Sequence, residues 1–224
     1  MKVSIIIDNR TVQADSGQNL LQACLGNGIY IPHLCYIDGI KRPLAACRLC
    51  FVEIEGEKGP VTACTQTVVG GMIVRTDTVP VRELQRSALE LLLSVHEVDC
   101  GHCPANKRCE LQRPAGMLKV KLRSGGLDRH LKAAVIDNSH PVFDYHPNRC
   151  ILCGKCVYIC GERNERPALS FVKRGLDTVV GFYRDEKTGR ACRSCMACTV
   201  ICPVGAIAGK GGSTDENSGS ASDY

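Results

Sequence analysis

Two short cysteine runs near the carboxyl end carry the strongest chemical signal in the chain. Three thiolates within seven residues can reach three iron corners of a 4Fe–4S cube, and the fourth cysteine of such a run typically ligates a neighbouring cluster. The runs are Cys150-x2-Cys153-x2-Cys156-x3-Cys160 and Cys192-x2-Cys195-x2-Cys198-x3-Cys202. We therefore expect two cubes with crossed ligation, one on Cys150, Cys153, Cys156 and Cys202 and the other on Cys160, Cys192, Cys195 and Cys198.

The same cysteines could instead hold structural zinc. Zinc takes four tetrahedral ligands, which are usually supplied by two separated CxxC pairs. Two runs with 2-2-3 spacing differ from that arrangement, so the spacing favours iron–sulfur cubes. Cys160 is followed by Gly161, whereas Cys202 is followed by Pro203. Because proline fixes φ, the chain that leaves the first run is less constrained than the chain that leaves the second.

Four cysteines in the first third of the chain have the donor set of a two-iron site. They are spaced as Cys35-x11-Cys47-x2-Cys50-x13-Cys64, and a 2Fe–2S cluster takes two thiolates on each iron. Residues 41–48 would wrap such a cluster and offer backbone amides to its sulfurs. Zinc is the serious alternative here, because Cys47-x2-Cys50 alone is a common zinc motif.

A histidine and three cysteines form a further candidate set between the other two. The pattern His96-x3-Cys100-x2-Cys103-x5-Cys109 supplies three thiolates for a 4Fe–4S cube and leaves one iron without a cysteine. We expect His96 to ligate that iron, and His102, which lies between two cysteines, to point away. A neutral imidazole makes the site less negative than a thiolate would, so this cluster should be easier to reduce than one with four cysteines.

Hydrophobic periodicity predicts strands and a helix around the first cysteine set. Residues 1–16 alternate as a hairpin that turns at 8–9, and a helix at 18–25, capped by Ser16, follows. A hairpin followed by a helix that crosses the sheet begins a β-grasp fold. Cys24 on this helix has no cysteine at ligand spacing, so we expect a buried thiol that binds no metal. Further short strands are expected at 51–54, 61–63, 169–172 and 179–183.

A longer amphipathic helix is expected at residues 79–95, with Pro80 in its first turn. Apolar side chains recur there at helical spacing, opposite charged ones. The predicted buried stripe consists of Leu84, Ala88, Leu91, Leu92 and Val95.

These elements and motifs predict an α+β chain of three domains. Residues 1–78 are expected to form a 2Fe–2S β-grasp ferredoxin-like domain. Residues 79–118 are expected to form a small helical domain for the His-ligated 4Fe–4S cluster, and residues 119–208 a two-cluster 4Fe–4S ferredoxin-like domain. Residues 209–224, which are rich in Ser, Gly, Asp and Glu, are expected to be a disordered tail.

Composition limits the function classes that need consideration. The 224 residues include 16 cysteines and carry a formal charge of +5. Anionic clusters would offset this charge, so we do not infer nucleic-acid binding. No apolar run approaches the roughly 18 residues that span a bilayer, and no signal peptide is recognised. We expect a cytoplasmic, reducing setting, where dense cysteine indicates metal or redox chemistry.

Six basic side chains between residues 119 and 132 form a belt without a metal motif. We expect a solvated surface that balances cluster charge, with a docking face for an acidic partner as the alternative. The belt consists of Lys119, Lys121, Arg123, Arg129, His130 and Lys132.

In series, the ligand sets closely resemble the N-terminal cluster-bearing region of iron-only (FeFe) hydrogenases. They are also similar to the N-terminal part of the large iron–sulfur subunit of respiratory complex I. The diaphorase iron–sulfur subunit of NAD-linked nickel–iron hydrogenases and NAD-dependent formate dehydrogenases share the arrangement. The resemblance covers residues 1 to about 208, rests on fifteen cysteines and His96, and implies one 2Fe–2S and three 4Fe–4S clusters on the sets above.

The resemblance implies an electron relay subunit of a multi-subunit NAD(P)-linked oxidoreductase. Its partners would be a flavin-containing subunit that oxidises NAD(P)H and a second catalytic subunit of hydrogenase or formate dehydrogenase type. Only a short tail follows Cys202, and there is no GxGxxG or P-loop motif, so we expect no active site on this chain. A free polyferredoxin carrier is the main alternative function, and a structural zinc protein is the other.

Overall fold

The amino-terminal third is a mixed five-stranded sheet that packs on one helix. The computed structural model describes residues 1–123, 126–183, 192 and 195–210. The strands lie in the order β2-β1-β5-β3-β4, with β1 and β5 parallel and the other pairs antiparallel. The elements are β1 Lys2–Ile7, β2 Arg10–Asp15, α1 Leu20–Gly26, β3 Phe51–Ile54, β4 Val61–Thr62, η1 Ala63–Thr65 and β5 Ile73–Arg75.

The predicted amino-terminal hairpin is confirmed. Asp8 and Asn9 form its turn with φ of 48° and 66°, which is the conformation that a two-residue hairpin turn requires. Ile5 faces Val12 across the ladder, and Ile5 and Ile7 are fully buried. Alternation along a half-buried strand therefore identified the hairpin and its turn, and the structure supplies the register.

Helix α1 forms where expected, but its cap differs from the prediction. The side chain of Asn19, rather than that of Ser16, accepts a hydrogen bond from the Gln22 amide at 3.2 Å. The Asn19 side-chain amide also donates to the Cys64 carbonyl at 2.6 Å, a long-range bond that a local pattern cannot reveal. Cys24 is fully buried, and burial raises the pKa of its thiol to about 12.

Helix α2, Val79–Ser94, begins after its cap Thr78, and its predicted buried stripe is correct only in part: Ala88 and Leu92 are half-buried against the core, but Leu84 is exposed. The core side is formed by Val81, Gln85, Leu89 and Leu93, whereas Leu91 is 61 % exposed. The face is set by a distant contact, because the Gln85 side chain donates to the Phe51 carbonyl at 3.0 Å. A polar residue can occupy a core position when its donor has such a partner.

The segment after α2 folds back along it. Short helices η2, Cys100–His102, and α3, Gln112–Leu118, follow. The Arg86 guanidinium of α2 donates to the Leu118 carbonyl at the end of α3 at 2.6 Å, so α3 is fixed against the long helix.

The carboxyl-terminal part consists of helices and two small antiparallel sheets, β6-β9 and β7-β8. The predicted strands at 169–172 and 179–183 are confirmed as one hairpin. Residue 209 lies in β9, and residues 211–224 of the predicted tail fall outside the described residues. The elements are β6 Phe143–Tyr145, α4 Lys155–Arg163, β7 Leu169–Val172, η3 Gly175–Asp177, β8 Val179–Phe182, α6 Ala197–Ile201 and β9 Ile207–Gly209.

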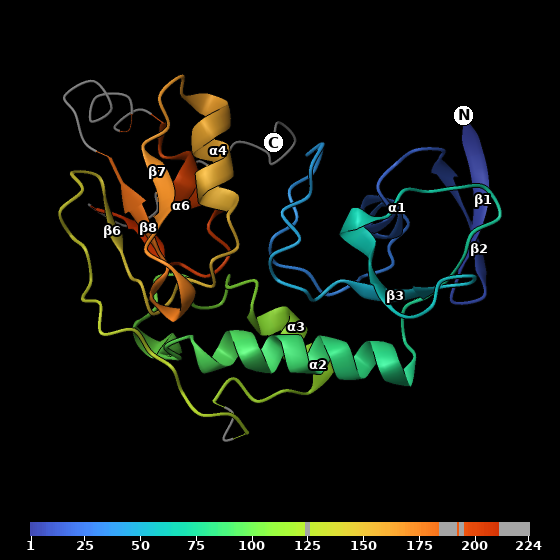
Figure 1. The fold of residues 1–224 in the computed structure, drawn as a ribbon, viewed down its shortest axis with the longest axis horizontal. Helices are drawn as coiled ribbons and strands as arrows, with labels where there is room; N and C mark the ends of the chain where they lie inside the picture. The colour runs from blue at the N-terminus through green and yellow to red at the C-terminus, as the bar shows by residue number, and fades with distance from the viewer. Residues whose placement is uncertain (124–125, 184–191, 193–194, 211–224) are drawn as a thin grey trace.

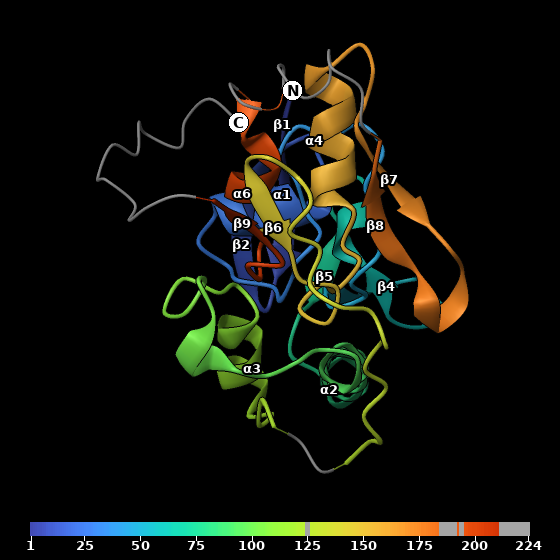
Figure 2. The ribbon, with the colours of Figure 1, turned by 90° about the vertical axis from the view of Figure 1, so that its left-hand side faces the viewer.

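Two hydrophobic cores organise these mixed helices and strands. One core fills the amino-terminal sheet and α1. The other joins α2 and α3 to β6, α4 and β8, and also includes Cys35 and Cys47. In Figure 1 the long helix α2 runs beneath both the amino-terminal sheet and the α4–β7–β8 region. Figure 2 shows α2 end-on beside α3. No helix among the described residues is both long and apolar enough to cross a bilayer.

Candidate iron–sulfur centres

Two cysteine pairs meet where the amino-terminal sheet adjoins the loop before β3. Cys35, Cys47, Cys50 and Cys64 are each at most 3 % exposed. The sulfurs of Cys35 and Cys47 lie 3.4 Å apart, and the thiols of Cys50 and Cys64 hydrogen-bond to each other. The structure therefore brings all four predicted residues of this set into one buried region.

In each of these pairs the hydrogen bond between the two cysteines lowers the pKa of one thiol and raises the pKa of the other. The hydrogen bond from Cys35 lowers the pKa of Cys47 to about 6, and the bond to Cys47 together with burial raises the pKa of Cys35. In the same way the bond to Cys50 lowers the pKa of Cys64. Thiolate is the metal-binding form of cysteine, so the fold favours two ligands in their binding state.

The second set lies between the end of α2 and the start of α3. Cys100, Cys103 and Cys109 are partly buried, and the charges of Cys103 and Cys100 contribute to the raised pKa of Cys109, whose main cause is burial. The side-chain amide of Gln112 lies 3.9 Å from the Cys100 sulfur. The three predicted thiols therefore lie close to one another.

Of the two histidines in this segment, only His96 is buried. It is 7 % exposed, and its Nδ1 has no hydrogen-bond partner among the described residues. Burial, with the nearby Arg149 charge, lowers the pKa of His96 to about 4, so the imidazole is neutral. The His102 side chain is 86 % exposed and pairs with Asp99 at 2.9 Å. A neutral, buried imidazole with an unused nitrogen fits a metal ligand.

The two carboxyl-terminal runs line two cavities, and each cavity takes residues from both runs. One is lined by Cys150, Cys153, Cys156 and Cys202, together with Tyr145. The other is lined by Cys160, Cys192, Cys195 and Cys198, together with His140. Among the described residues, no three His, Cys, Asp or Glu side chains converge as tightly as a single metal ion requires.

Backbone amides donate hydrogen bonds to the sulfurs of Cys160 and Cys202. Each is the fourth cysteine of its run and is assigned to the cluster of the other run. The Ala168 amide donates to the Cys160 sulfur at 3.2 Å, and the Ala206 amide donates to the Cys202 sulfur at 3.3 Å. Such bonds stabilise negative charge on sulfur and tune the potential of a thiolate-bound cluster. Burial raises the pKa of Cys153 to about 12, so the Cys153 thiol needs a positive partner, such as iron, before it ionises.

Three polar residues at these sites escaped the sequence reasoning. The Tyr145 hydroxyl accepts a hydrogen bond from the Val180 amide at 3.0 Å and hydrogen-bonds to Cys150. His140 stacks on Phe143 with a ring separation of 3.7 Å. Arg149 is buried directly before the first ligand run. The position of Arg149 next to Cys150 was the only sign of these residues in the sequence. The burial of Tyr145 and His140 depends on tertiary packing, which a local pattern does not reveal.

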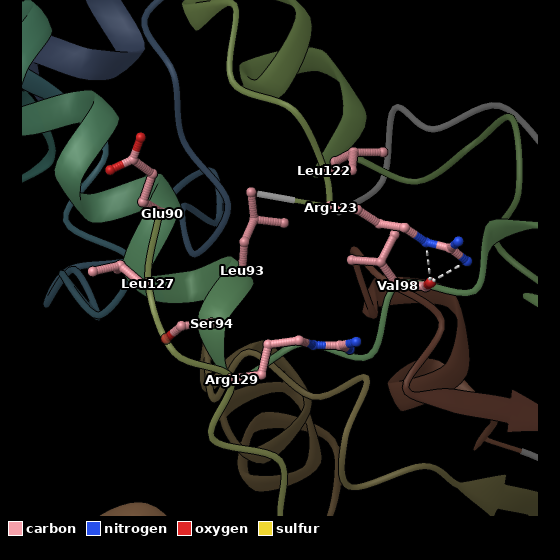
Figure 3. Close-up of a pocket in the computed structure, with 8 residues that line it drawn as sticks. All are labelled: Glu90, Leu93, Ser94, Val98, Leu122, Arg123, Leu127 and Arg129. Atoms are coloured by element: carbon pink, nitrogen blue, oxygen red, sulfur yellow. Dashed lines mark hydrogen bonds between the residues drawn. The ribbon is translucent and has the colours of Figure 1, made fainter. Parts of the chain in front are cut away.

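The predicted basic belt lies mainly at the surface, beside a cavity at the end of α2 (Figure 3). Glu90, Leu93 and Ser94 of α2 line that cavity together with residues 122, 123, 127 and 129. Arg123 is turned toward the Val98 carbonyl, to which it donates from Nε and Nη2 at 3.2 and 3.0 Å. These two hydrogen bonds therefore hold the loop that contains Arg123 against the segment between His96 and Cys100.

Comparison with known protein families matches two iron–sulfur regions. Residues 1–79 match the 2Fe-2S iron-sulfur cluster binding domain. Residues 85–123 match the NADH-ubiquinone oxidoreductase-G iron-sulfur binding region. The chain is related to the iron–sulfur G subunits of NADH-quinone oxidoreductases.

Individual relatives agree with this relationship. The second G-type subunit of the NADH-quinone oxidoreductase of Rhizobium meliloti (strain 1021) is 36 % identical over 92 % of this chain and 24 % of its own length. The NADP-reducing hydrogenase protein HndD of Solidesulfovibrio fructosivorans is 32 % identical over 92 % of this chain and 36 % of its own length. The chain thus spans about a quarter to a third of these relatives.

A solved structure extends the similarity to three dimensions. A chain of the NAD+-reducing [NiFe]-hydrogenase in the H2-reduced state superimposes with a TM-score of 0.81 at 29 % sequence identity. The match covers 95 % of this chain and 89 % of that one. The expected resemblance to complex I and hydrogenase iron–sulfur subunits is therefore confirmed.

Proposed function

We propose that this chain is the iron–sulfur electron relay subunit of a multi-subunit NAD(P)-linked oxidoreductase. It would join a flavin-containing subunit that oxidises NAD(P)H to a second catalytic subunit of hydrogenase, formate dehydrogenase or NADH-dehydrogenase type. The chain itself would have no turnover. The similarity to relatives whose names state NADH, NADP and hydrogenase activities supports this proposal.

The proposal assigns one 2Fe–2S cluster to a β-grasp domain and three 4Fe–4S clusters to the remaining sets. The order and direction of the five strands around α1 support the β-grasp assignment. Bound clusters would supply reversible one-electron chemistry. The ligands would be Cys35, Cys47, Cys50 and Cys64; His96, Cys100, Cys103 and Cys109; Cys150, Cys153, Cys156 and Cys202; and Cys160, Cys192, Cys195 and Cys198.

The donor chemistry of the described residues fits these clusters. The two cavities lined by four cysteines each support crossed ligation. The buried, neutral His96 with its unpartnered Nδ1 supports a ligand set of one imidazole and three thiols. Around these sites the protein can exclude water and direct backbone amides toward sulfur. In these two ways a protein tunes the reduction potential of an iron–sulfur cluster.

The observation that carries the proposal is that contacts join neighbouring ligand sets to each other. A Cβ built on Gly154, within the Cys150 run, would lie 3.3 Å from Leu44 of the loop that wraps the first set. The Glu110 amide, next to Cys109, donates to the Pro203 carbonyl, next to Cys202, at 2.9 Å. Electron relay needs cofactors held close together in a rigid matrix, and these contacts connect the sites directly.

Anaerobic purification followed by iron and acid-labile sulfide analysis tests the cluster content. The cluster types assigned here predict about fourteen irons per chain. A folded preparation with zinc and no sulfide would contradict the proposal. Because all sixteen cysteines are unpaired in the structure, the proposal also includes a reducing compartment such as the cytoplasm.

Affinity purification from the source cells under anaerobic conditions tests the relay role. We expect a flavin-containing subunit to co-purify and NADH or NADPH to bleach the cluster absorbance of the complex. A chain that carries its clusters but purifies alone, and that accepts electrons only from soluble carriers, would instead be a free polyferredoxin.

A further inference from the structure

A buried arginine lies where the His96 set meets the Cys150 set. Arg149 is 7 % exposed and directly precedes Cys150. One guanidinium nitrogen, Nη2, donates to the carbonyl of His102, which lies between Cys100 and Cys103, at 3.4 Å. The positive charge of Arg149 also contributes to the lowered pKa of both His96 and His146. The guanidinium therefore lies beside the His96 set, while its own backbone leads directly into the Cys150 run.

This guanidinium has no carboxylate partner. None of the ion pairs among the described residues includes Arg149, and its Nε is buried without a hydrogen-bond partner in that part of the chain. Burial of an unpaired charge is strongly unfavourable, since arginine does not lose its proton in proteins. Arg149 therefore needs a nearby negative group that no carboxylate in the described part of the chain supplies.

The second buried cation provides a contrast. Lys155 is 9 % exposed and lies between Cys153 and Cys156, but its ammonium has Glu110 at 3.8 Å. The described residues thus provide a carboxylate for Lys155 and none for Arg149.

We propose that Arg149 is a fixed positive charge at the His96 site, where it raises the reduction potential of the cluster bound there. The inference rests on the proposed function, since the missing negative charge would be that of the thiolate-bound clusters. Reduction adds one negative charge to a cluster, so a buried cation stabilises the reduced form more than the oxidised form. Because the guanidinium is buried, salt screens this effect only weakly.

The test compares Arg149→Gln, which removes the charge, with Arg149→Lys, which keeps it. Redox titrations of the purified holoprotein, followed by EPR, report the potentials of the separate clusters. For Arg149→Gln we expect the reduced-to-oxidised ratio of the cluster at the His96 site to fall about tenfold at a fixed potential, which is ~59 mV for one electron. The 2Fe–2S signal and the potentials of Arg149→Lys should change much less.

Arg174→Gln is the matched control, because it removes the same charge from an exposed position on the β7–β8 hairpin. Unchanged potentials in an iron-replete Arg149→Gln protein would overturn the inference and leave the relay proposal intact. Loss of iron from Arg149→Gln but not from Arg149→Lys would support a need for the charge. Loss of iron from both Arg149→Gln and Arg149→Lys would overturn the inference, since lysine keeps the positive charge. A wild-type chain without iron and sulfide would overturn both proposals.

Discussion

At the scale of single residues, His96 is the side chain whose replacement has the clearest predicted sign. Burial holds its imidazole neutral, whereas a cysteine at the same position would bind iron as a thiolate. His96→Cys therefore adds one negative charge to a cluster, and we expect the midpoint potential of that cluster to fall. An EPR-monitored redox titration measures the change.

His102→Ala is the control for this prediction, because His102 is exposed and bonded to Asp99. It should leave every cluster potential unchanged. An equal shift in the two variants, or no shift in His96→Cys with full iron content, would exclude His96 as the ligand.

Tyr145 gives a second prediction at the residue scale. Its hydroxyl accepts from the Val180 amide and hydrogen-bonds to Cys150. Tyr145→Phe leaves that buried amide without a partner, which should lower the free energy of unfolding by about 1–3 kcal/mol. Denaturant unfolding of the holoprotein, followed by cluster absorbance, measures this. Tyr183→Phe, at a position that is 68 % exposed, should have little effect, and equal stabilities of the two variants would contradict the assigned role.

At the scale of elements, the contact between Gly205 and Ala105 joins the segment before β9 to the loop between Cys103 and Cys109. A Cβ at Gly205 would lie 2.7 Å from that of Ala105, and Gly205 has φ of +65°. Gly205→Ala therefore combines left-handed strain with a steric clash, which together should cost about 2–5 kcal/mol. Thermal unfolding and iron content per chain test this.

Gly28→Ala is the matched control for that clash. Gly28 has φ of +73° but no atom within 4 Å of a built Cβ, so it should show only the left-handed strain of about 1–2 kcal/mol. If Gly205→Ala and Gly28→Ala lower the free energy of unfolding by the same amount, the close approach of Gly205 to Ala105 does not restrict the side chain at position 205.

The elements also indicate how far the sequence determines the structure. Alternation and a two-residue turn were sufficient for the β1–β2 hairpin, since both signals are local. The length of α2 was predicted but its buried face only in part, because the place of Gln85 in the core depends on a bond to Phe51, which lies 34 residues away. Cysteine spacing predicted which thiols gather, whereas the burial of Arg149 depends on the His102 carbonyl 47 residues away.

At the scale of the whole molecule, the two cores differ in what fills them. The amino-terminal core contains Ile5, Ile7, Leu20, Leu21 and Val74 in addition to two candidate ligands. In the carboxyl-terminal part, the second core combines aliphatic side chains such as Ile151, Leu169 and Val180 with all four cysteines of the Cys150 run. Small domains of that kind depend on metal for stability.

This difference predicts that cluster removal unfolds one part of the molecule before the other. After extraction of iron by a chelator, amide hydrogen exchange should speed up most in β6, α4 and β7, because their buried thiols lose the iron that offsets their desolvation. Strands β1 and β2 should retain most of their protection, since aliphatic packing holds their core. Hydrogen-exchange mass spectrometry of the holo and iron-free forms resolves these elements. Equal loss of protection in both parts would mean that the molecule unfolds as one cooperative unit whose amino-terminal sheet depends equally on the clusters.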